Sequence, residues 1–175
     1  GDYGVQAYIE FLARVDARLA ELQPDGAKSR AEATHPGFAH RSTLLPDGRA
    51  VRVDVALVAS SLSREGVELD AWYDALTPRA DVIFYSGHAG LGDNVRQLMT
   101  KGVFASGKYT LWVANGCDTF AYVDRTLADR RATLNPDDPS GTRYLDTVST
   151  VLGGYFTTGP TTGMSILDAL LRAYD

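Results

Sequence analysis

Residues 81–92 read DVIFYSGHAGLG, and residues 109–118 read YTLWVANGCD. Each stretch opens with a run of β-branched, aromatic and aliphatic residues, which is typical of a buried strand. Each then passes into a polar turn that contains glycine. A helix is predicted between them, over residues 94–101, and strands that alternate with helices favour a mostly parallel sheet. The two predicted strands lead into two chemically reactive side chains, His88 and Cys117.

The rest of the chain supplies the remaining elements of an α/β fold. Apolar residues at intervals of three and four predict amphipathic helices, and Pro46-Asp47-Gly48 between two extended runs predicts a hairpin. The further predicted elements are helices over 5–22, 69–76 and 162–174, hairpin arms over 38–45 and 49–59, and a strand over 144–149. We therefore expect a mostly parallel central sheet, covered by helices on both faces, with an added hairpin.

The composition is that of an ordinary globular domain. The chain has 175 residues, of which 45% are hydrophobic and 22% are charged, and a chain of this size buries a substantial core. Its formal net charge of -5 argues against a nucleic-acid partner. No apolar run approaches the roughly 20 residues that cross a bilayer, so we expect no membrane partner either. Cys117 is the single cysteine, which excludes an internal disulfide.

The first residues bear on how much of the protein this chain represents. The chain begins Gly-Asp-Tyr-Gly, without methionine, and passes directly into the first predicted helix. We expect residues 1–175 to be a single domain excised from a longer protein, with a first strand of the sheet upstream. An upstream segment or a second subunit would then fill the open edge of the sheet. The cellular location stays open.

The positions of His88 and Cys117 predict a site for acyl transfer. Active sites of open parallel sheets lie beyond the carboxyl ends of the strands, where both residues fall. A histidine can take the proton of a thiol, and the thiolate is a strong nucleophile. Glycine-rich turns leave backbone amides accessible to an oxyanion. The alternative is structural, because a cysteine at the end of an apolar strand is often core packing and a histidine in a glycine turn is often only a turn residue.

Other kinds of site find little support in the sequence. No group of histidine, cysteine and acidic residues has the spacing of metal ligands. The glycine-rich turn over 87–92 lacks the Lys-Ser/Thr pair of a P-loop and the G-x-G-x-x-G order of a dinucleotide site. We therefore expect neither a metal nor an organic cofactor.

Residues 82–88 and 111–117 resemble the two signature blocks of caspase-like (clan CD) cysteine peptidases, a group that includes caspases, metacaspases, legumains and gingipains. In that group one hydrophobic strand ends in the catalytic histidine and the next ends in the catalytic cysteine. Residues 148–150 and 154–156 look like the strand and loop that line the primary specificity pocket. The resemblance covers about residues 50–175 and implies a three-layer α/β/α sandwich.

The resemblance also implies roles for single residues. Cys117 is then the nucleophile, His88 is the general base and acid, and the backbone amides of Ala89 and Cys117 form the oxyanion hole. Ala89 stands where the family usually has glycine. His88 and Cys117 are 29 positions apart, fewer than the roughly 50 typical of caspases. This shorter connection favours a compact bacterial relative, nearer to metacaspases and gingipains than to true caspases.

The substrate implied by the resemblance is a protein or peptide. The caspase block Gln-Ala-Cys-Arg-Gly is replaced by Asn115-Gly116-Cys117-Asp118, so aspartate specificity is not expected. Asp146 and Asp118 are acids able to pair with an arginine or lysine of the substrate, the preference of metacaspases and gingipains. Asn115 and Ser149 complete the candidate substrate-binding residues.

Residues 124–143 contain two prolines and many charged residues but few apolar ones, a composition that predicts a flexible linker within the domain. Caspase-like enzymes are often activated by a cut between the nucleophile strand and the pocket strand. Arg130 and Arg131 lie in this segment and are the candidate self-cleavage sites of an enzyme that prefers basic residues.

These observations together predict a cysteine endopeptidase that acts through a His88-Cys117 dyad and a thioester acyl-enzyme. Two alternatives stay open. One is a catalytically degenerate domain of the same fold that binds a partner protein, which Ala89 favours. The other is a cysteine hydrolase or transferase that acts on a small acyl substrate.

Overall fold

The structure is a computed structural model that describes residues 2–22, 30–35 and 37–172. The described residues belong to two compact units, one made of residues 1–58 with 156–175 and the other of residues 59–155. Each unit contains a sheet of three strands of its own. The single domain expected over residues 1–175 stays a prediction.

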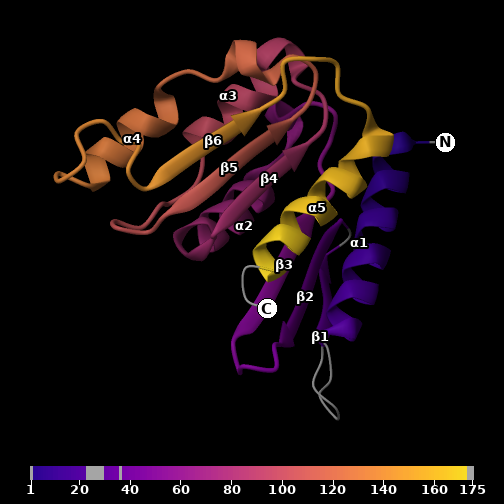
Figure 1. The fold of residues 1–175 in the computed structure, drawn as a ribbon. Coiled ribbons are helices and arrows are strands. Elements are labelled where there is room, and N and C mark those ends of the chain that lie inside the picture. Colours follow the sequence, from indigo (N-terminus) through magenta and orange to yellow (C-terminus); the bar gives the residue numbers. More distant parts are fainter. Residues whose placement is uncertain (1, 23–29, 36, 173–175) are drawn as a thin grey trace. The chain divides into compact units, whose positions relative to one another are not determined.

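The first unit contains an antiparallel sheet and two long helices (Figure 1). The strands follow the order β1-β2-β3, and an ion pair of 2.8 Å between Arg18 and Asp168 joins the helices. The elements are α1 (Tyr3–Glu21), β1 (Arg30–His35), β2 (Phe38–Leu44), β3 (Ala50–Ala56) and α5 (Gly159–Arg172). Both helices agree with the periodicity of the sequence, although the last residues predicted for the second one lie outside the described residues.

The predicted hairpin is confirmed. β2 and β3 pair antiparallel from Phe38 opposite Ala56 to Leu44 opposite Ala50. Gly48 adopts a φ of +83° in the connecting turn, a conformation that favours glycine. β1 was not predicted, because alanine is the sole apolar residue type in its sequence RAEATH and the surrounding stretch is polar. The three strands form a sheet of their own and do not extend the parallel one.

The second unit is built on a parallel sheet. Its strands β4 (Val82–Ser86), β5 (Thr110–Asn115) and β6 (Leu145–Ser149), all three predicted from the sequence, lie in that order. The α-helices of the unit are α2 (Val67–Leu76), α3 (Asp93–Thr100) and α4 (Thr126–Leu134), and short 3-10 turns include η1 (Leu62–Arg64), η3 (Gly90–Gly92) and η4 (Thr119–Tyr122). Helices α2 and α3 lie behind the sheet in Figure 1.

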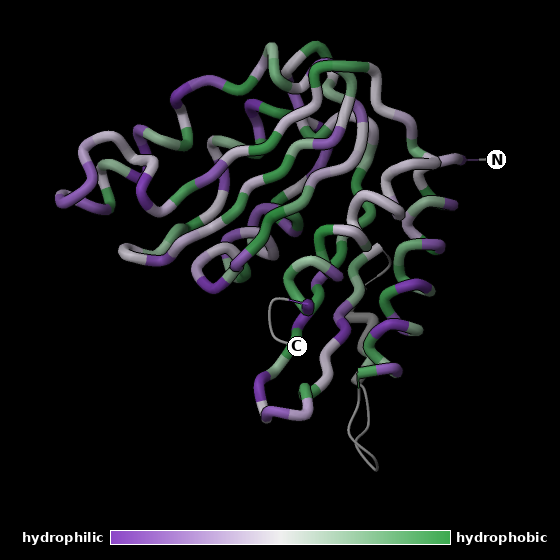
Figure 2. Tube along the Cα trace, viewed as in Figure 1, coloured by the Kyte–Doolittle hydropathy of each residue, from purple (hydrophilic) through white to green (hydrophobic). Residues whose placement is uncertain are grey.

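The core of this unit gathers around the central strand β5. Trp112 and Ala114 are fully buried, and Val95 and Met99 of α3 are fully buried as well. Figure 2 shows the hydrophobic residues concentrated along the strands of this sheet. The α/β class, the parallel sheet and the hairpin are thus confirmed, whereas a sandwich of three layers is not.

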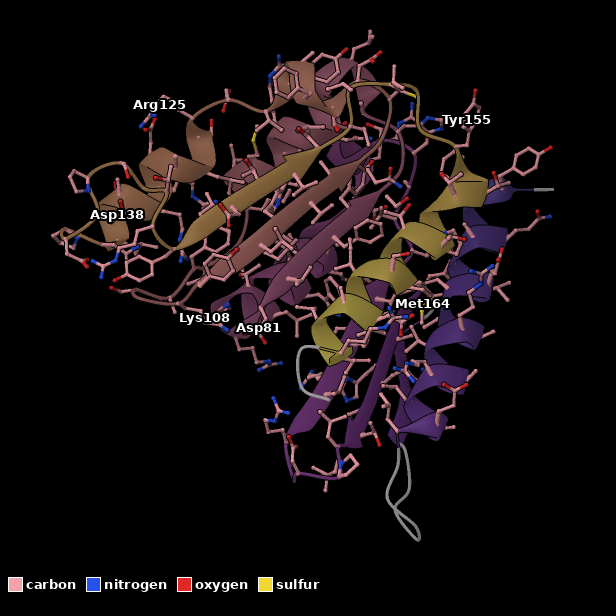
Figure 3. The ribbon with its side chains drawn as sticks, viewed as in Figure 1. Asp81, Lys108, Arg125, Asp138, Tyr155 and Met164 are labelled. Carbon is pink, nitrogen blue, oxygen red and sulfur yellow. The ribbon has the colours of Figure 1, made fainter. Side chains whose placement is uncertain are left out.

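The segment 124–143 differs from the predicted flexible linker. It contains the helix α4, and the side chain of Arg131 within that helix is fully buried. Beyond the helix, Asp138 accepts hydrogen bonds from the Ser140 hydroxyl (2.6 Å) and from the Arg143 amide (2.8 Å) and so orders the turn that leads to β6 (Figure 3). Hydrogen bonds of charged and polar side chains order this segment, although the scarcity of apolar residues predicted a flexible linker.

None of the helices in the described part of the chain combines the length and the apolar character that a membrane span requires.

Candidate functional site

A pocket lies where β4 and β5 end. The last residues of the two strands, Ser86 and Asn115, are partners in the parallel register, and the Gly87 amide donates to the Asn115 carbonyl at 3.0 Å. The turns that follow therefore leave the sheet side by side. The pocket has a volume of about 460 Å³ and is lined by Ser60, His88, Ala89, Gly90, Leu91, Cys117, Asp118 and Tyr122. Both predicted catalytic residues line it.

Glycines bring the turns into backbone contact at this place. A Cβ atom on Gly116 would lie 2.5 Å from the carbonyl oxygen of Gly87, and one on Gly154 would lie 3.0 Å from the Cα of Gly116. The first distance is shorter than real Cβ contacts, so position 116 requires glycine, and the second is tighter than nine in ten of them. Three turns, which follow three neighbouring strands, thus meet at Gly116.

The segment after β6 runs beside the residues that follow Cys117. The Asp118 amide donates to the Leu152 carbonyl at 3.2 Å, and the Phe120 amide donates to the Thr150 carbonyl at 3.0 Å. The Gly116 amide donates to the Thr150 hydroxyl at 3.3 Å. These bonds fix the chain on both sides of the cysteine.

Cys117 itself is exposed and lies on the pocket wall. Its Sγ–H donates to the carbonyl oxygen of Gly154 at 3.6 Å. A thiol in this position is accessible to a reagent or a substrate, and it is not a packing residue of the core, which was the structural alternative.

Two side chains hold the turn that carries His88 by donating hydrogen bonds to the His88 carbonyl oxygen. The Tyr85 hydroxyl donates to the His88 carbonyl oxygen at 2.6 Å, and the Asn94 amide nitrogen Nδ2 donates to the same oxygen at 2.8 Å. Burial raises the pKa of Tyr85 to about 12, although the hydrogen bond with Asn94 acts in the opposite direction. The hydroxyl therefore stays protonated, and remains a donor, throughout the neutral range.

Sequence reasoning missed Tyr85 and Asn94 as residues that hold the turn carrying His88. Asn94 was assigned only to the start of a helix, and Tyr85 only to the strand before the turn. The sequence does not show their hydrogen-bond partners, because the partners of a buried side chain come from segments that meet only in the folded chain. The sequence shows only that a polar residue, Asn94, stands in the first turn of α3. A polar residue at such a position is ordinarily exposed to solvent, so its burial is not expected from the sequence.

Two residues of the pocket wall have strained backbones. Leu91 (φ 52°) and Asp118 (φ 50°) are the non-glycine residues with positive φ in the described part of the chain. This conformation costs about 1–3 kcal/mol for a residue with a Cβ atom and clusters at functional sites. Both residues line the same pocket, Leu91 from the turn that follows β4 and Asp118 from the turn that follows β5.

The other predicted substrate-binding residues divide between the pocket and the sheet. Asp118 lines the pocket. Asn115 is buried and its Nδ2 donates to the Ser86 hydroxyl at 3.1 Å, so it joins the ends of two strands. Ser149 is the last residue of β6, opposite Ala114, and is not part of the pocket wall.

Asp146 lies at the other end of the sheet. It is opposite Leu111 in the parallel register, near the start of β5, whereas Cys117 follows the end of that strand. Its carboxylate accepts a hydrogen bond from the Tyr109 hydroxyl at 2.7 Å. Asp146 is therefore not part of the pocket wall, and Asp118 is the acidic residue that lines the pocket.

The two candidate self-cleavage residues lie in the interior of helix α4. Arg130 donates to the carbonyl groups of Met99 (2.8 Å) and Gly102 (2.6 Å), and Arg131 donates to that of Tyr144 (3.1 Å). A peptidase binds its substrate in extended form, with the side chains accessible. The folded chain therefore does not present these two peptide bonds for cleavage.

No group of three or more histidine, cysteine or acidic side chains lies in a metal-binding arrangement within residues 2–22, 30–35 and 37–172. Comparison of the chain with protein-family models, with curated proteins and with solved structures found no match.

Proposed function

We propose that the protein is a cysteine endopeptidase of caspase-like type, with Cys117 as nucleophile, His88 as general base and acid, and a three-layer α/β/α sandwich as its fold. One observation carries the proposal: His88 and Cys117 follow adjacent parallel strands and line a single pocket. This is the place where open parallel sheets form their active sites. The order of the elements and the exposed thiol of Cys117 agree with the resemblance between the two segments and the caspase-like signature blocks.

The proposed reaction has two stages. In the first, the His88 imidazole takes the proton of the Cys117 thiol, Sγ attacks the carbonyl carbon of the scissile bond, and a tetrahedral oxyanion forms. The oxyanion collapses, the C–N bond breaks, and His88 returns its proton to the leaving amine, which leaves a thioester on Cys117. In the second stage, a water gives its proton to His88, attacks the thioester and releases the carboxylic acid, and the proton returns to sulfur.

The backbone amides of Ala89 and Cys117 are the candidate donors to the oxyanion. Among the described residues, neither amide has an acceptor in the hydrogen-bond network. The two turns that carry them are in backbone contact, because the Ala89 nitrogen lies 3.5 Å from the position of a Cβ atom on Gly116. Unpaired backbone amides at the edge of a pocket are the groups that stabilise tetrahedral intermediates in acyl transfer.

Asp118 supports a preference for a basic side chain in the substrate. Its carboxylate is exposed on the pocket wall, directly after the nucleophile. An arginine or lysine of the substrate would pair with this charge. We therefore expect Arg and Lys probes to react faster than Asp or Leu probes, and we expect Asp118→Asn to reduce that difference about 10-fold, as for a charge-assisted hydrogen bond.

The experiment that tests the function is covalent labelling of Cys117. Peptidyl acyloxymethyl ketones with Arg, Lys, Asp or Leu at the reactive end are incubated with the protein, and intact mass is measured over time. We expect one adduct per chain, absent in Cys117→Ala and slowed at least 100-fold in His88→Ala, since removal of a general base costs about 10²–10⁴-fold.

The outcomes separate the candidate functions. Labelling that does not depend on His88 would contradict the dyad. Labelling that depends on His88 but ignores the peptide part would favour the hydrolase or transferase of small acyl groups. An unlabelled protein that circular dichroism shows to be folded would overturn the peptidase and favour the partner-binding domain.

A further inference from the structure

We propose that Asn94 is the positioning residue of this site, because its buried carboxamide holds together the two segments that form the pocket wall around His88. The proposal rests on the proposed function, since it assigns Asn94 a role in the action of His88. Asn94 touches neither the substrate nor the reacting atoms. Its role is to fix the turn from which His88 acts.

The contacts of the Asn94 side chain connect three places in the chain. The residue is 1% exposed. Its Nδ2 lies 2.8 Å from the His88 carbonyl oxygen and 3.0 Å from the Ser60 carbonyl oxygen, and its Oδ1 accepts from the Leu62 amide at 2.8 Å. Ser60 and His88 both line the pocket. One planar group therefore sets the distance between the two segments.

The chemistry of the contacts requires a carboxamide. The partners are two carbonyl oxygens, which need donors, and one amide, which needs an acceptor. Asparagine provides two N–H donors and a carbonyl acceptor on one rigid plane, whereas aspartate has acceptors alone when ionised. Aspartate at position 94 would place its negative oxygen against the carbonyl oxygens of Ser60 and His88.

The glycine-rich turn is shaped around this side chain. A Cβ atom on Gly90 would lie 3.3 Å from the Cγ of Asn94, closer than nine in ten real Cβ contacts. Gly90, Leu91 and Gly92 all have positive φ, so the turn bends in the left-handed region as it passes Asn94. The Tyr85 hydroxyl, 3.2 Å from Asn94 Nδ2, adds a second donor to the His88 carbonyl.

Loss of these contacts is expected to release the turn without unfolding the unit. A displacement of about 1 Å in a catalytic group can cost about 100-fold in rate. Because Asn94 acts through His88, its substitution has little further effect once His88 is absent. This non-additivity distinguishes a positioning role from a general loss of stability.

The test is a double-mutant cycle between Asn94→Asp and His88→Ala, measured at pH 7.5 as the rate of Cys117 labelling by the Arg acyloxymethyl ketone. We expect Asn94→Asp alone to slow labelling about 10–100-fold, and to change the rate less than 3-fold on the His88→Ala background. Tyr85→Phe, which removes one of the two donors to the His88 carbonyl, is expected to cause a smaller loss in the same direction.

The matched control is Asn135→Asp. Asn135 is also fully buried in this unit, accepts from the Gly107 amide at 2.6 Å and donates to the Arg131 carbonyl at 2.8 Å, and it is not part of the pocket wall. Its substitution disturbs a buried carboxamide of the same kind. The labelling rate of the folded Asn135→Asp protein is expected to stay within 2-fold of wild type.

A second measurement keeps the test independent of catalysis. The Hε1 resonance of His88, assigned by its loss in His88→Ala, is recorded by proton NMR for folded samples of each variant. We expect this resonance to shift or broaden in Asn94→Asp and to stay unchanged in Asn135→Asp.

The two proposals fail in different ways. If wild type is not labelled at all, the proposed function fails, and the His88 resonance still decides whether Asn94 positions the turn. A folded Asn94→Asp protein with a wild-type labelling rate and an unchanged His88 resonance would overturn the positioning role. Equal effects of Asn94→Asp with and without His88 would overturn it as well.

Discussion

Gly116 lies where the turns after three strands meet, and only a hydrogen atom fits on its Cα in the direction of Gly87. A Cβ atom on Gly116 would lie 2.5 Å from the carbonyl oxygen of Gly87, and a Cβ atom on Gly154 would lie 3.0 Å from the Cα of Gly116. The close contact places Cys117, the next residue, against both neighbouring turns. The Gly87 oxygen belongs to the backbone, so it cannot move aside as the end of a flexible side chain would.

Gly116→Ala is therefore expected to separate the turns. We expect the free energy of unfolding to fall by about 1–3 kcal/mol, the usual cost of forcing an extra carbon into a packed site, and Cys117 labelling to slow at least 10-fold. Gly153→Ala in the neighbouring loop is the control, because a Cβ atom there meets nothing within 4 Å. Urea denaturation and labelling kinetics of both variants check this; equal behaviour of the two would contradict the steric argument.

At the scale of an element, helix α4 is attached to its surroundings by arginines in place of an apolar stripe. The Arg131 side chain is fully buried, lies 5.3 Å from the centre of the Phe104 ring, and donates to the carbonyl groups of Ala105 (3.4 Å), Lys108 and Tyr144 (3.1 Å). The aliphatic part of an arginine fills space in a core while the guanidinium satisfies carbonyl groups that would otherwise lack a donor. A hydropathy pattern counts such a residue as a surface charge.

Arg131→Ala is expected to lower the free energy of unfolding by about 3–5 kcal/mol, because it leaves a cavity and three carbonyl groups without their donor. Arg125, the N-cap residue of the same helix, is exposed and gives the control (Figure 3). Arg125→Ala is expected to change the free energy by no more than about 0.5 kcal/mol. Chemical denaturation of both variants tests this, and similar values for the two would show that burial of Arg131 contributes nothing.

At the scale of the whole molecule, two tyrosines couple stability to alkaline pH. Burial raises the pKa of Tyr73 and that of Tyr85 from 10.0 to about 12. In the unfolded chain both phenols ionise near their ordinary value of about 10. Between these two pH values the unfolded state has lost protons that the folded state keeps, so rising pH favours unfolding.

The free energy of unfolding is thus expected to be unaffected by these two groups below pH 10 and to decrease between pH 10 and 12. The double variant Tyr73→Phe/Tyr85→Phe removes both groups, and we expect its stability to fall less steeply over that range. Urea denaturation at a series of pH values measures the slope. A slope equal to that of wild type would show that these phenols ionise alike in the folded and unfolded states.

The sequence by itself determined the features that depend on neighbouring residues. Apolar runs that end in glycine turns predicted β4 and β5, and the alternation of strands with helices predicted their parallel orientation, which the structure shows. His88 and Cys117 were therefore expected at one edge of the sheet before any coordinates were considered. Backbone preferences and the spacing of apolar residues determine these features, and both can be read from short stretches of sequence.

Only the tertiary structure decided which side chains surround that edge. Asn94 contacts Ser60 and Leu62, which precede it by more than thirty positions, and Arg131 contacts carbonyl groups on other segments. A buried polar group is stable only with its partners in place, and those partners come together only when distant segments pack, so no local pattern reveals them.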